Sequence, residues 1–519
     1  MRKREKTLHL EDNMYRKPNG QMVIKEFDLP FEGELNADNR WVKLAQLIPW
    51  EKIEKKYAEL FLSDTGTVAK PLRMALGSLI IKDKCDFTDR ETVEHITENP
   101  YMQYFIGLKR YQKEPPFDPS LMVHFRKRLD KETMMEINEM ICAKEQEPEQ
   151  EEKPDDPQDP GDPPNMGSAE VEAEQVPEEQ AVTQEDSHAE SKPEEPMNKG
   201  KLLLDATCAP ADIRYPTDLS LLNEAREKSE GMIDALYHVN LGLNKKPRTY
   251  RKKARKAYLS IAKQRKPQTK SIRRAIGKQL GFLGRNLRAI DKLLKLDGHG
   301  TLDNRQSREL ETIRLLYEQQ RSMYTQKTHQ VSERIVSISQ PHVRPIVRGK
   351  ANAPTEFGAK LAVSMVDGYM FVDELSWNPF NESNNLKQAV EDYKKRYGYY
   401  PEAVLADQIY RNRDNRAYCK QHGIRLSGPA LGRPAAQEAK NKKRIEQQDM
   451  KERNAIEGGF GVGKRRYGLG RIMARLKETS ESEIMLQFIV MNLEHRLRTL
   501  FFHFYSLLLV RTWRLSLSQ

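Results

Sequence analysis

The stretch "KLLLDATCAP", Lys201 to Pro210, is a short apolar run that carries one carboxylate, Asp205. Apolar runs of this length next to polar sequence are typical of a buried strand. We expect the strand to end at Asp205. Ligand sites in open α/β sheets gather at the carboxyl ends of strands, so Asp205 is a candidate functional residue.

More strand-like sequence follows downstream of this run. "AKLAVSMVDGYMFVDEL", residues 359–375, contains two β-prone runs joined by Asp367 and Gly368, a dipeptide favoured in tight hairpins. "NLKQAVEDYKKRYGYYP", residues 385–401, has the spacing of an amphipathic helix and ends in glycine and proline. A hairpin followed by a helix is therefore predicted after residue 358.

A second buried strand is predicted in "EAVLADQIY", residues 402–410, and it ends in Asp407. The segment "YCKQHGIRLSGP", residues 418–429, gives the end of a helix and then a short strand. The predicted order is strand, hairpin, helix, strand, helix, strand and helix. This order predicts an α/β fold, a mixed sheet with helices packed on it.

Residues 1–143 are predicted to form an all-α N-terminal domain for DNA binding or assembly. "DPSLMVHFRKRLDKETMMEINEMI" predicts one long helix that starts near Asp118, with Arg126 and Lys127 in its early turns. Such a helix could lie in a DNA groove, or it could belong to a plain helical bundle with a solvated basic face. The sequence leaves both interpretations open.

Charge is distributed unevenly along the 519 residues, whose net charge is +11. Residues 145–197 hold 19 acidic and 2 basic side chains, so the rest of the chain carries +28. Residues 144–199, rich in acid and proline, cannot bury a core and are predicted to be a disordered linker. A basic body with a separate acidic tether points to a polyanionic partner, for which nucleic acid is the best candidate.

A basic helical insertion is predicted at about residues 220–335, between the two aspartates. Residues 245–290 contain 17 Lys and Arg and no acid. They could clamp DNA with an affinity that depends on salt, or form an exposed helical pair with solvated charges. The candidate DNA-binding residues here are Arg251, Lys252, Lys253, Arg255 and Lys256.

Several classes of protein are disfavoured. The four cysteines are scattered, which argues against a disulfide framework or a thiolate zinc site and suits a reducing compartment. The first residues lack the apolar core of a signal peptide. Residues 498–519 are predicted as an apolar helix or tail, and their run "LFFHFYSLLLV" is too short to span a bilayer. We therefore expect no membrane partner.

A third carboxylate, Glu457, lies in "NAIEGGFGVGKRRYGLGR", residues 454–471. Gly458, Gly463 and Lys464 have the spacing of a nucleotide-binding loop. That loop requires a preceding hydrophobic strand and Ser or Thr after the lysine, whereas here the preceding sequence is charged and Arg465 follows. We expect the glycines to let the chain turn or pack closely to DNA instead.

Asp205, Asp407 and Glu457 together would form a hard oxygen site suited to Mg²⁺ or Mn²⁺. Two such ions roughly 3.5–4 Å apart can activate a hydroxyl and stabilise the leaving oxygen in phosphodiester chemistry. The chain has 76 acidic residues, so the argument rests on placement at two strand ends and one helix. The placement predicts metal-dependent phosphoryl transfer on DNA.

Three separated motifs resemble the bacterial insertion-sequence transposases of the DDE class. They are "LLLDATCAPADIRYPTDLSLLNEAR", "VLADQIYRNRDNRAYCKQHGIRLSGPALGRP" and "RNAIEGGFGVGKRRYGL". One branch of the class has a Tyr-x2-Arg-x3-Glu-x6-Lys signature. Arg453, Glu457 and Lys464 match three of its positions, while Met450 stands at the tyrosine position. The N-terminal segments "SLIIKDKCDFTDRETVEHITENPYMQYFIGL" and "PPFDPSLMVHFRKRL" also resemble these proteins.

The resemblance implies a transposase with an RNase H-like catalytic domain at residues 200–497. Such an enzyme binds double-stranded DNA at its element's inverted repeats, cuts there and joins the ends to target DNA. It would use Asp205, Asp407 and Glu457 to hold two Mg²⁺ or Mn²⁺ ions, as a homodimer or larger assembly in the bacterial cytoplasm, associated with the nucleoid. Arg453 and Lys464 would contact phosphates, and Arg465 joins them as a DNA-binding candidate. The alternatives are a nuclease without strand transfer and an inactive DNA-binding protein.

Overall fold

The computed structural model describes residues 27–29, 33–61, 68–143, 198–237, 245–296, 300–347, 355–429 and 436–517, the last with backbone alone for residues 436–440, 442 and 502–517. Contacts group the described residues up to residue 142 and those from residue 198 onward into one compact unit. The acidic segment predicted as a linker lies, from residue 144 to residue 197, outside the described residues.

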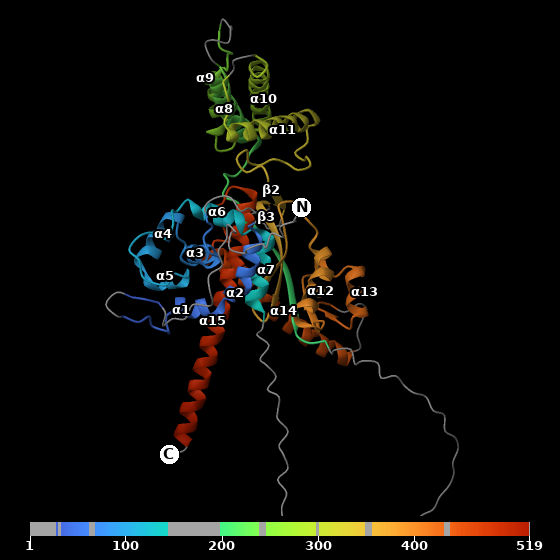
Figure 1. Cartoon of the computed structure of the whole chain (residues 1–519). Helices are drawn as coiled ribbons and strands as arrows, with labels where there is room; N and C mark the ends of the chain where they lie inside the picture. The colour runs from blue at the N-terminus through green and yellow to red at the C-terminus, as the bar shows by residue number, and fades with distance from the viewer. Residues whose placement is uncertain are drawn as a thin grey trace, which may run out of the picture. The chain divides into compact units, whose positions relative to one another are not determined.

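The N-terminal region is helical (Figure 1). A capping box starts its fourth helix, where the Thr88 side chain accepts from the Glu91 N–H and the Glu91 carboxylate accepts from the Thr88 N–H. The helices are α1 (Arg40–Leu47), α2 (Trp50–Glu59), α3 (Leu72–Cys85), α4 (Asp89–Glu98), α5 (Pro100–Phe105), α6 (Leu121–Arg128) and α7 (Lys131–Cys142).

The prediction of one long helix from Asp118 is wrong, because the chain forms α6 and α7 with a break between them. Leu129 leaves the helical conformation, with φ −86° and ψ 76°. The Asp130 carboxylate then accepts a hydrogen bond from the Thr133 N–H at 2.9 Å. An aspartate that caps a new helix competes with continuation of the old one, which explains the break.

A six-stranded mixed sheet forms the centre of the C-terminal region, in the order β2-β3-β1-β5-β6, with β4 also paired to β3. β3 is antiparallel to β1, β2 and β4, while β5 is parallel to both β1 and β6. The mixed α/β fold class is therefore confirmed. The strands are β1 (Lys201–Pro210), β2 (Arg344–Val347), β3 (Thr355–Val366), β4 (Tyr369–Ser376), β5 (Ala403–Leu405) and β6 (Arg425–Leu426).

The hairpin between β3 and β4 turns at Asp367 and Gly368, as the sequence predicts. Both residues have positive φ, 51° and 85°, as the favoured two-residue hairpin turn requires. Glycine is needed at the second position for another reason as well, because a Cβ there would collide with the His495 ring.

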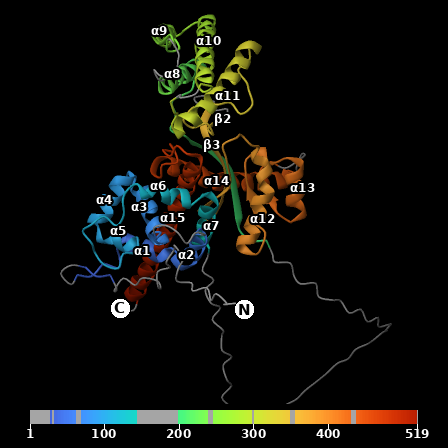
Figure 2. The same cartoon turned by 45° about the horizontal axis from the view of Figure 1, so that its top comes forward.

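Helices cover both faces of the sheet (Figure 2). On one face, α12 (Leu386–Tyr397) and α13 (Arg413–Gln421) pack Val390 and Cys419 against Leu202 and Leu204 of β1. Gly398, with φ 82°, ends α12 as predicted. The opposite face is covered by α14 (Ala436–Arg466) and α15 (Lys477–Leu517). Short 3-10 turns, η3 (Glu382–Asn385) and η4 (Gln408–Tyr410), lie between these elements.

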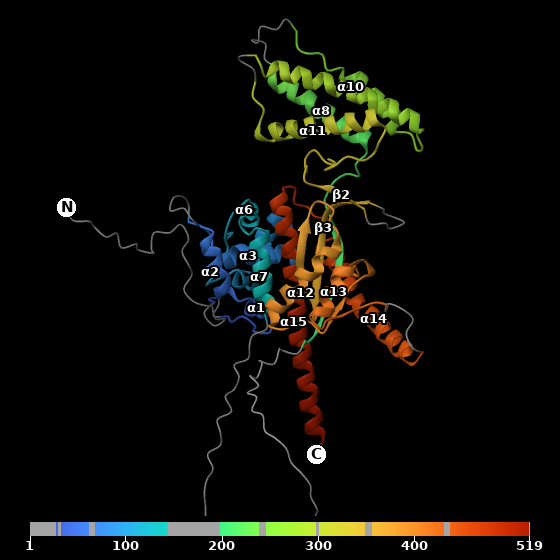
Figure 3. The same cartoon turned by 90° about the vertical axis from the view of Figure 1, so that its right-hand side faces the viewer.

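The basic insertion is predicted between β1 and β2, and the described residues there form four helices. They are α8 (Asp218–Leu236), α9 (Arg251–Ala262), α10 (Thr269–Leu293) and α11 (Asn304–Gln326). Leucine and isoleucine side chains of α8, α10 and α11 form a hydrophobic core of their own. Figure 3 shows these three helices packed together. The insertion is thus a packed helical subdomain and not merely a pair of helices.

α15 packs against both the N-terminal helices and the sheet, since it contacts α3, α6, α7 and β4. A buried polar network joins three of these elements. The Asn492 side chain donates to the Met370 carbonyl at 2.7 Å and to the Asn138 carboxamide at 2.8 Å, and its own oxygen accepts from the Met370 N–H at 2.8 Å. The N-terminal helices are therefore built into the same core as the sheet.

Candidate active site

Asp205 and Asp407 lie at the same level of the sheet. Leu203 of β1 pairs in parallel with Leu405 of β5, and each aspartate follows its leucine by two residues. Asp407 comes just after β5 ends, as predicted, and its carboxylate accepts from the Gln408 N–H at 2.7 Å. The prediction that β1 ends at Asp205 is wrong, because β3 continues to pair with β1 as far as Pro210.

Glu457 is brought over this pair by α14. Ile456 and Phe460 of α14 are buried in the same core cluster as Leu203. Leu203 and Asp205 are two residues apart in a strand, so their side chains share that face of the sheet. Glu457 follows Ile456 directly and remains about half exposed, at 53%. The third predicted carboxylate is therefore carried to the sheet face that bears Asp205.

Arg453 lies between two of the three acids. Its guanidinium nitrogens are 3.3 Å from an oxygen of Asp407 and 3.6 Å from an oxygen of Glu457, which is one helical turn further on. The Arg453 side chain is 23% exposed. Its charge also acts on Asp205, so one cation is shared by the whole group. Three carboxylates around one guanidinium give this site a negative electrostatic potential.

Burial raises the pKa of Asp205, and the negative charges of Glu457 and Glu382 raise it further. The Ala206 N–H, which donates to the Asp205 carboxylate at 2.7 Å, and the Arg453 charge both oppose this rise. Among the described residues, no three His, Cys, Asp or Glu side chains are close enough together to hold a metal ion. Asp407 and Glu457 are thus linked through Arg453, whose charge also acts on Asp205.

α14 is continuous from Ala436 to Arg466, so the prediction that the glycines let the chain turn is wrong. Continuity places Lys464 about two turns beyond Glu457 on nearly the same face. Met450, at the tyrosine position of the signature, lies two turns before Glu457 and is 64% exposed. Arg465 is exposed, and its side chain donates to the Gly461 carbonyl of its own helix at 3.1 Å.

Comparison with known proteins identifies two regions of the chain. Residues 404–494, which include Asp407 and Glu457, match the family described as Transposase DDE domain. Residues 29–128 match a second family, described as Transposase domain. Two separate regions of this chain are thus similar to transposase families. The predicted resemblance is therefore confirmed, although Asp205 lies outside both matched regions.

A curated relative of this chain is the uncharacterized protein ORF8 in the nfe locus of Rhizobium meliloti. The two are 34% identical over 103 residues, which cover 20% of this chain and 49% of that protein. The chain thus spans about half the length of the curated relative that it matches. No solved structure matches this chain.

The predicted DNA-binding residues of the N-terminal region differ in their surroundings. Arg126 is 13% exposed and forms a two-pronged ion pair with Asp89, at 2.9 and 2.6 Å. Its carbonyl also accepts from the Ser482 hydroxyl of α15 at 2.9 Å. Lys127 is exposed. Arg126 therefore makes internal contacts, while Lys127 remains open to solvent.

In the insertion, Arg251 forms ion pairs with Glu230 and Asp234 of α8, which fasten the start of α9. The next four candidates lie on exposed positions of α9: Lys252, Lys253, Arg255 and Lys256. Only Ala254 of this helix is buried. α9 therefore offers a cationic surface, while Arg251 has a structural contact as well.

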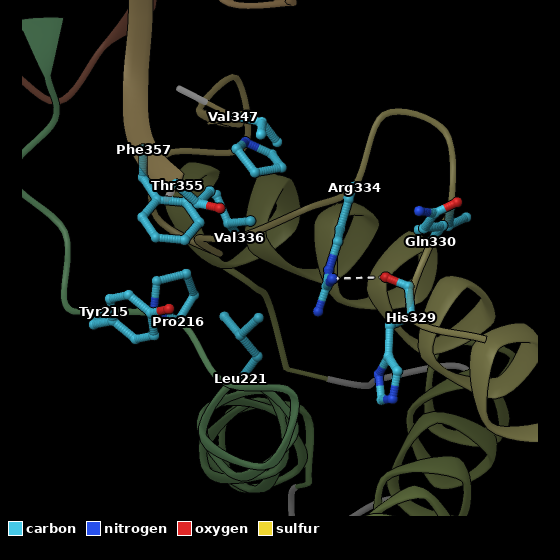
Figure 4. Close-up of a pocket in the computed structure, with 12 residues that line it drawn as sticks. Tyr215, Pro216, Leu221, His329, Gln330, Arg334, Val336, Val347, Thr355 and Phe357 are labelled. Atoms are coloured by element: carbon cyan, nitrogen blue, oxygen red, sulfur yellow. Dashed lines mark hydrogen bonds between the residues drawn. The ribbon is translucent and has the colours of Figure 1, made fainter. Parts of the chain in front are cut away.

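A separate pocket of about 370 Å³ lies beside the start of α8 and the start of β3 (Figure 4). Tyr215 meets Phe357 edge to face, with 5.4 Å between their ring centroids. The Arg334 side chain donates to the His329 carbonyl at 2.9 Å on the other side of the pocket. None of the predicted site residues lines it. In the part of the chain that the structure describes, no helix is both long and apolar enough to cross a membrane.

Sequence reasoning missed several charged residues around α14. Lys201 of β1 contacts Glu452, and Arg425 of β6 contacts Asp449. Glu382 of η3, paired with Lys360 at 2.8 Å, is close enough to Asp205 to raise its pKa. No motif marks these residues. The one signal was the lysine at the start of an apolar strand, four residues before Asp205.

Proposed function

We propose that this chain is a metal-dependent DNA transposase of an insertion sequence. It would bind terminal inverted repeats, cut the element's ends and transfer the freed strands to target DNA. The observation that carries the proposal is the placement of Asp205, Asp407 and Glu457 near Arg453. Asp407, Glu457 and Arg453 all lie inside the region that matches the Transposase DDE domain. Because the aligned region covers only part of this chain and part of its relative, the activity of the whole chain is part of the proposal.

We further propose that the sheet is an RNase H-like core. The support is its arrangement: β1 has the antiparallel β3–β4 hairpin on one side and the parallel strands β5 and β6 on the other. Two acids lie at the level where β5 ends, and a helix covers them with a third. This arrangement gathers ligands where the strand pattern changes direction.

The donor set suits a divalent metal in its chemistry. Asp205, Asp407 and Glu457 offer carboxylate oxygens alone, which Mg²⁺ and Mn²⁺ prefer, and the group already attracts the Arg453 cation. When bound, such ions would polarise the scissile phosphate and activate the attacking hydroxyl. Asp205 would share this task from within the sheet, and its partial burial would limit access of bulk water.

The cations of the chain would hold the substrate. Arg453 and Lys464, on nearly one face of α14, would contact phosphates on either side of Glu457. Arg465, Lys127 and the exposed lysines and arginines of α9 would bind the DNA backbone, giving affinity that falls with salt. Since two element ends must be brought together, we expect a homodimer or larger assembly, associated with the nucleoid in the cytoplasm.

The direct test of the proposal uses purified protein, Mg²⁺ or Mn²⁺, and DNA that carries the element's ends. We expect cleavage and strand-transfer products from the wild type. Asp205→Asn, Asp407→Asn and Glu457→Gln should each lower product formation at least about 100-fold while DNA binding in a mobility-shift assay is kept.

The matched control is Asp414→Asn, which removes an exposed carboxylate at the start of α13. Full activity in any triad variant would remove that residue from the site. Cleavage without joining would favour the nuclease alternative, and binding without cleavage would favour an inactive DNA-binding protein.

A further inference from the structure

Two ion pairs outside the acid triad connect α14 to the sheet. Lys201, the first residue of β1, contacts the Glu452 carboxylate at 2.8 Å. Arg425, the first residue of β6, makes a two-pronged contact with Asp449, whose second pair of atoms is 2.9 Å apart. Asp407, just after β5, contacts Arg453, so a residue in or next to each of the adjacent parallel strands β1, β5 and β6 makes a charge contact with the helix.

Along β1 the residue of the ion pair precedes the acid of the candidate site, and the same order holds along α14. Lys201 and Asp205 point to the same face of β1, about 13 Å apart along the strand. Glu452 and Glu457 follow in the same sense along α14, about 7.5 Å apart along the helix axis. The pair at the start of β1 therefore lies beside the site, one step removed from the catalytic acids.

Few large apolar side chains hold α14 against the sheet. Among its described side chains, only Ile456 and Phe460 are large, apolar and buried. Asp449, by contrast, is 7% exposed although it is charged, and its partner Arg425 satisfies it. A slip of one residue would rotate the helix by about 100° and turn Glu457 away from the aspartates.

We propose that Lys201–Glu452 and Arg425–Asp449 are positioning pairs that set the rotation and register of α14, so that Glu457 reaches Asp205 and Asp407. Charged pairs that are partly buried are better attested as determinants of register than as sources of stability. The proposal rests on the proposed function for its catalytic meaning. Neither pair touches substrate in this role, so each acts through Glu457.

The test exchanges the charges of one pair in the full-length protein. Lys201→Glu places two carboxylates together, Glu452→Lys places two ammonium groups together, and the double variant restores an opposite-charge pair. Lys451→Glu is the control, since it makes the same change of charge on an exposed neighbouring residue of α14.

Two measurements separate positioning from mere stability. We expect each single variant to weaken binding of Mn²⁺, followed by its electron paramagnetic resonance signal without DNA, by about tenfold. In the cleavage assay kcat should fall by about the same factor while KM for DNA stays unchanged. The double variant should recover most of both losses, and the control should match the wild type.

A third measurement reports the register without metal or catalysis. In a protein that carries Asp205→Cys and Glu457→Cys, a short thiol cross-linker should join the two positions. The rate of cross-linking should fall about tenfold in each single charge variant and return to the original rate in the double charge variant. A cross-linking rate that no charge change alters would overturn the proposal. So would a folded double variant no better than its worse parent. If the wild type failed to bind Mn²⁺ or to cut DNA, that result would instead contradict the proposed function.

Discussion

Asp205 shows what it costs the fold to place a carboxylate inside a buried strand. It stands in a strand between Leu204 and Ala206, both buried, and its carboxylate loses hydration there. Burial together with Glu457 and Glu382 raises its pKa, and these effects exceed the help from Arg453 and the Ala206 N–H. A residue that a fold keeps against its own stability is a sign of function.

We predict that Asp205→Asn stabilises the metal-free protein at neutral pH. The folded state raises the pKa of Asp205 above its unfolded value of 3.8. The contribution of Asp205 to the free energy of unfolding is therefore highest below pH 3.8, where Asp205 is protonated, and it falls as the pH rises through the folded pKa and the carboxylate ionises. Asparagine removes that loss. Thermal unfolding should show a midpoint about 1–2 °C above the wild type at pH 7.5.

The difference between variant and wild type should vanish as the pH is lowered toward 4, if the protein still unfolds reversibly there. Asp414→Asn, at an exposed carboxylate, provides the comparison and should show little difference at either pH. A lower midpoint for Asp205→Asn at pH 7.5 would contradict the assignment of Asp205 as a destabilising acid.

The sequence was informative about residues that carry their own signal. Asp205 and Asp407 each stand at the end of a predicted apolar strand, and Glu457 lies in a recognisable motif. Arg126 could not be interpreted in the same way. Its partner Asp89 is 37 residues away, and a cation that binds DNA has the same local sequence as one that closes an internal ion pair.

At the scale of the element, α14 shows how glycines let a helix pack closely against its neighbours. The space available for a Cβ differs from one of its glycines to the next. A Cβ at Gly459 would be 2.7 Å from the Met370 sulfur, and one at Gly463 would be 3.0 Å from the Met491 sulfur. A Cβ at Gly458 would meet nothing within 4 Å. Gly459 and Gly463 therefore let α14 lie close to β4 and α15.

We predict opposite outcomes for two adjacent substitutions in α14. Gly458→Ala should stabilise the protein by up to about 1 kcal/mol, because alanine has the higher helix propensity and the position is open. Gly459→Ala should lose that gain or be destabilising, since Met370 must move. Chemical denaturation measures both. An equal stabilisation by the two variants would contradict the close packing at Gly459.

The same glycines explain why the helix was hard to predict. Four glycines in six residues, from Gly458 to Gly463, have low helix propensity, and local sequence favours a turn there. Tertiary packing on the sheet and α15 outweighs that preference. The break between α6 and α7 is the reverse case, because a local capping signal at Asp130 prevails over a sequence that otherwise favours one continuous helix.

At the scale of the whole molecule, α15 connects the two regions that match transposase families. Lys84 of α3 pairs with Glu494, and the Arg496 side chain donates to the Ile141 carbonyl of α7 at 2.8 Å. The sequence predicted a helical N-terminal region and a mixed sheet separately. The sequence could not predict that the two regions share a core, because a shared core depends on contacts between residues that are hundreds of positions apart in the chain.

The buried Asn492 network gives the last prediction. Asn492→Ala would leave the Met370 backbone groups and the Asn138 side chain without this partner, a loss of about 1–3 kcal/mol for buried polar groups. Because α7, β4 and α15 meet there, unfolding should begin at lower temperature in both regions together. Tryptophan fluorescence reports this, with Trp41 in α1 and Trp377 after β4 retained singly in turn.

The control is Thr499→Ala, also on α15, where the hydroxyl donates only to the His495 carbonyl of its own helix at 3.0 Å. We expect both tryptophan reporters to shift down together in Asn492→Ala and neither to shift in the control. If the reporter in α1 kept its wild-type midpoint while the one after β4 fell, the two regions would unfold independently. A common shift would mean that α15 makes them one cooperative unit, so that the N-terminal helices help hold the face on which α14 places Glu457.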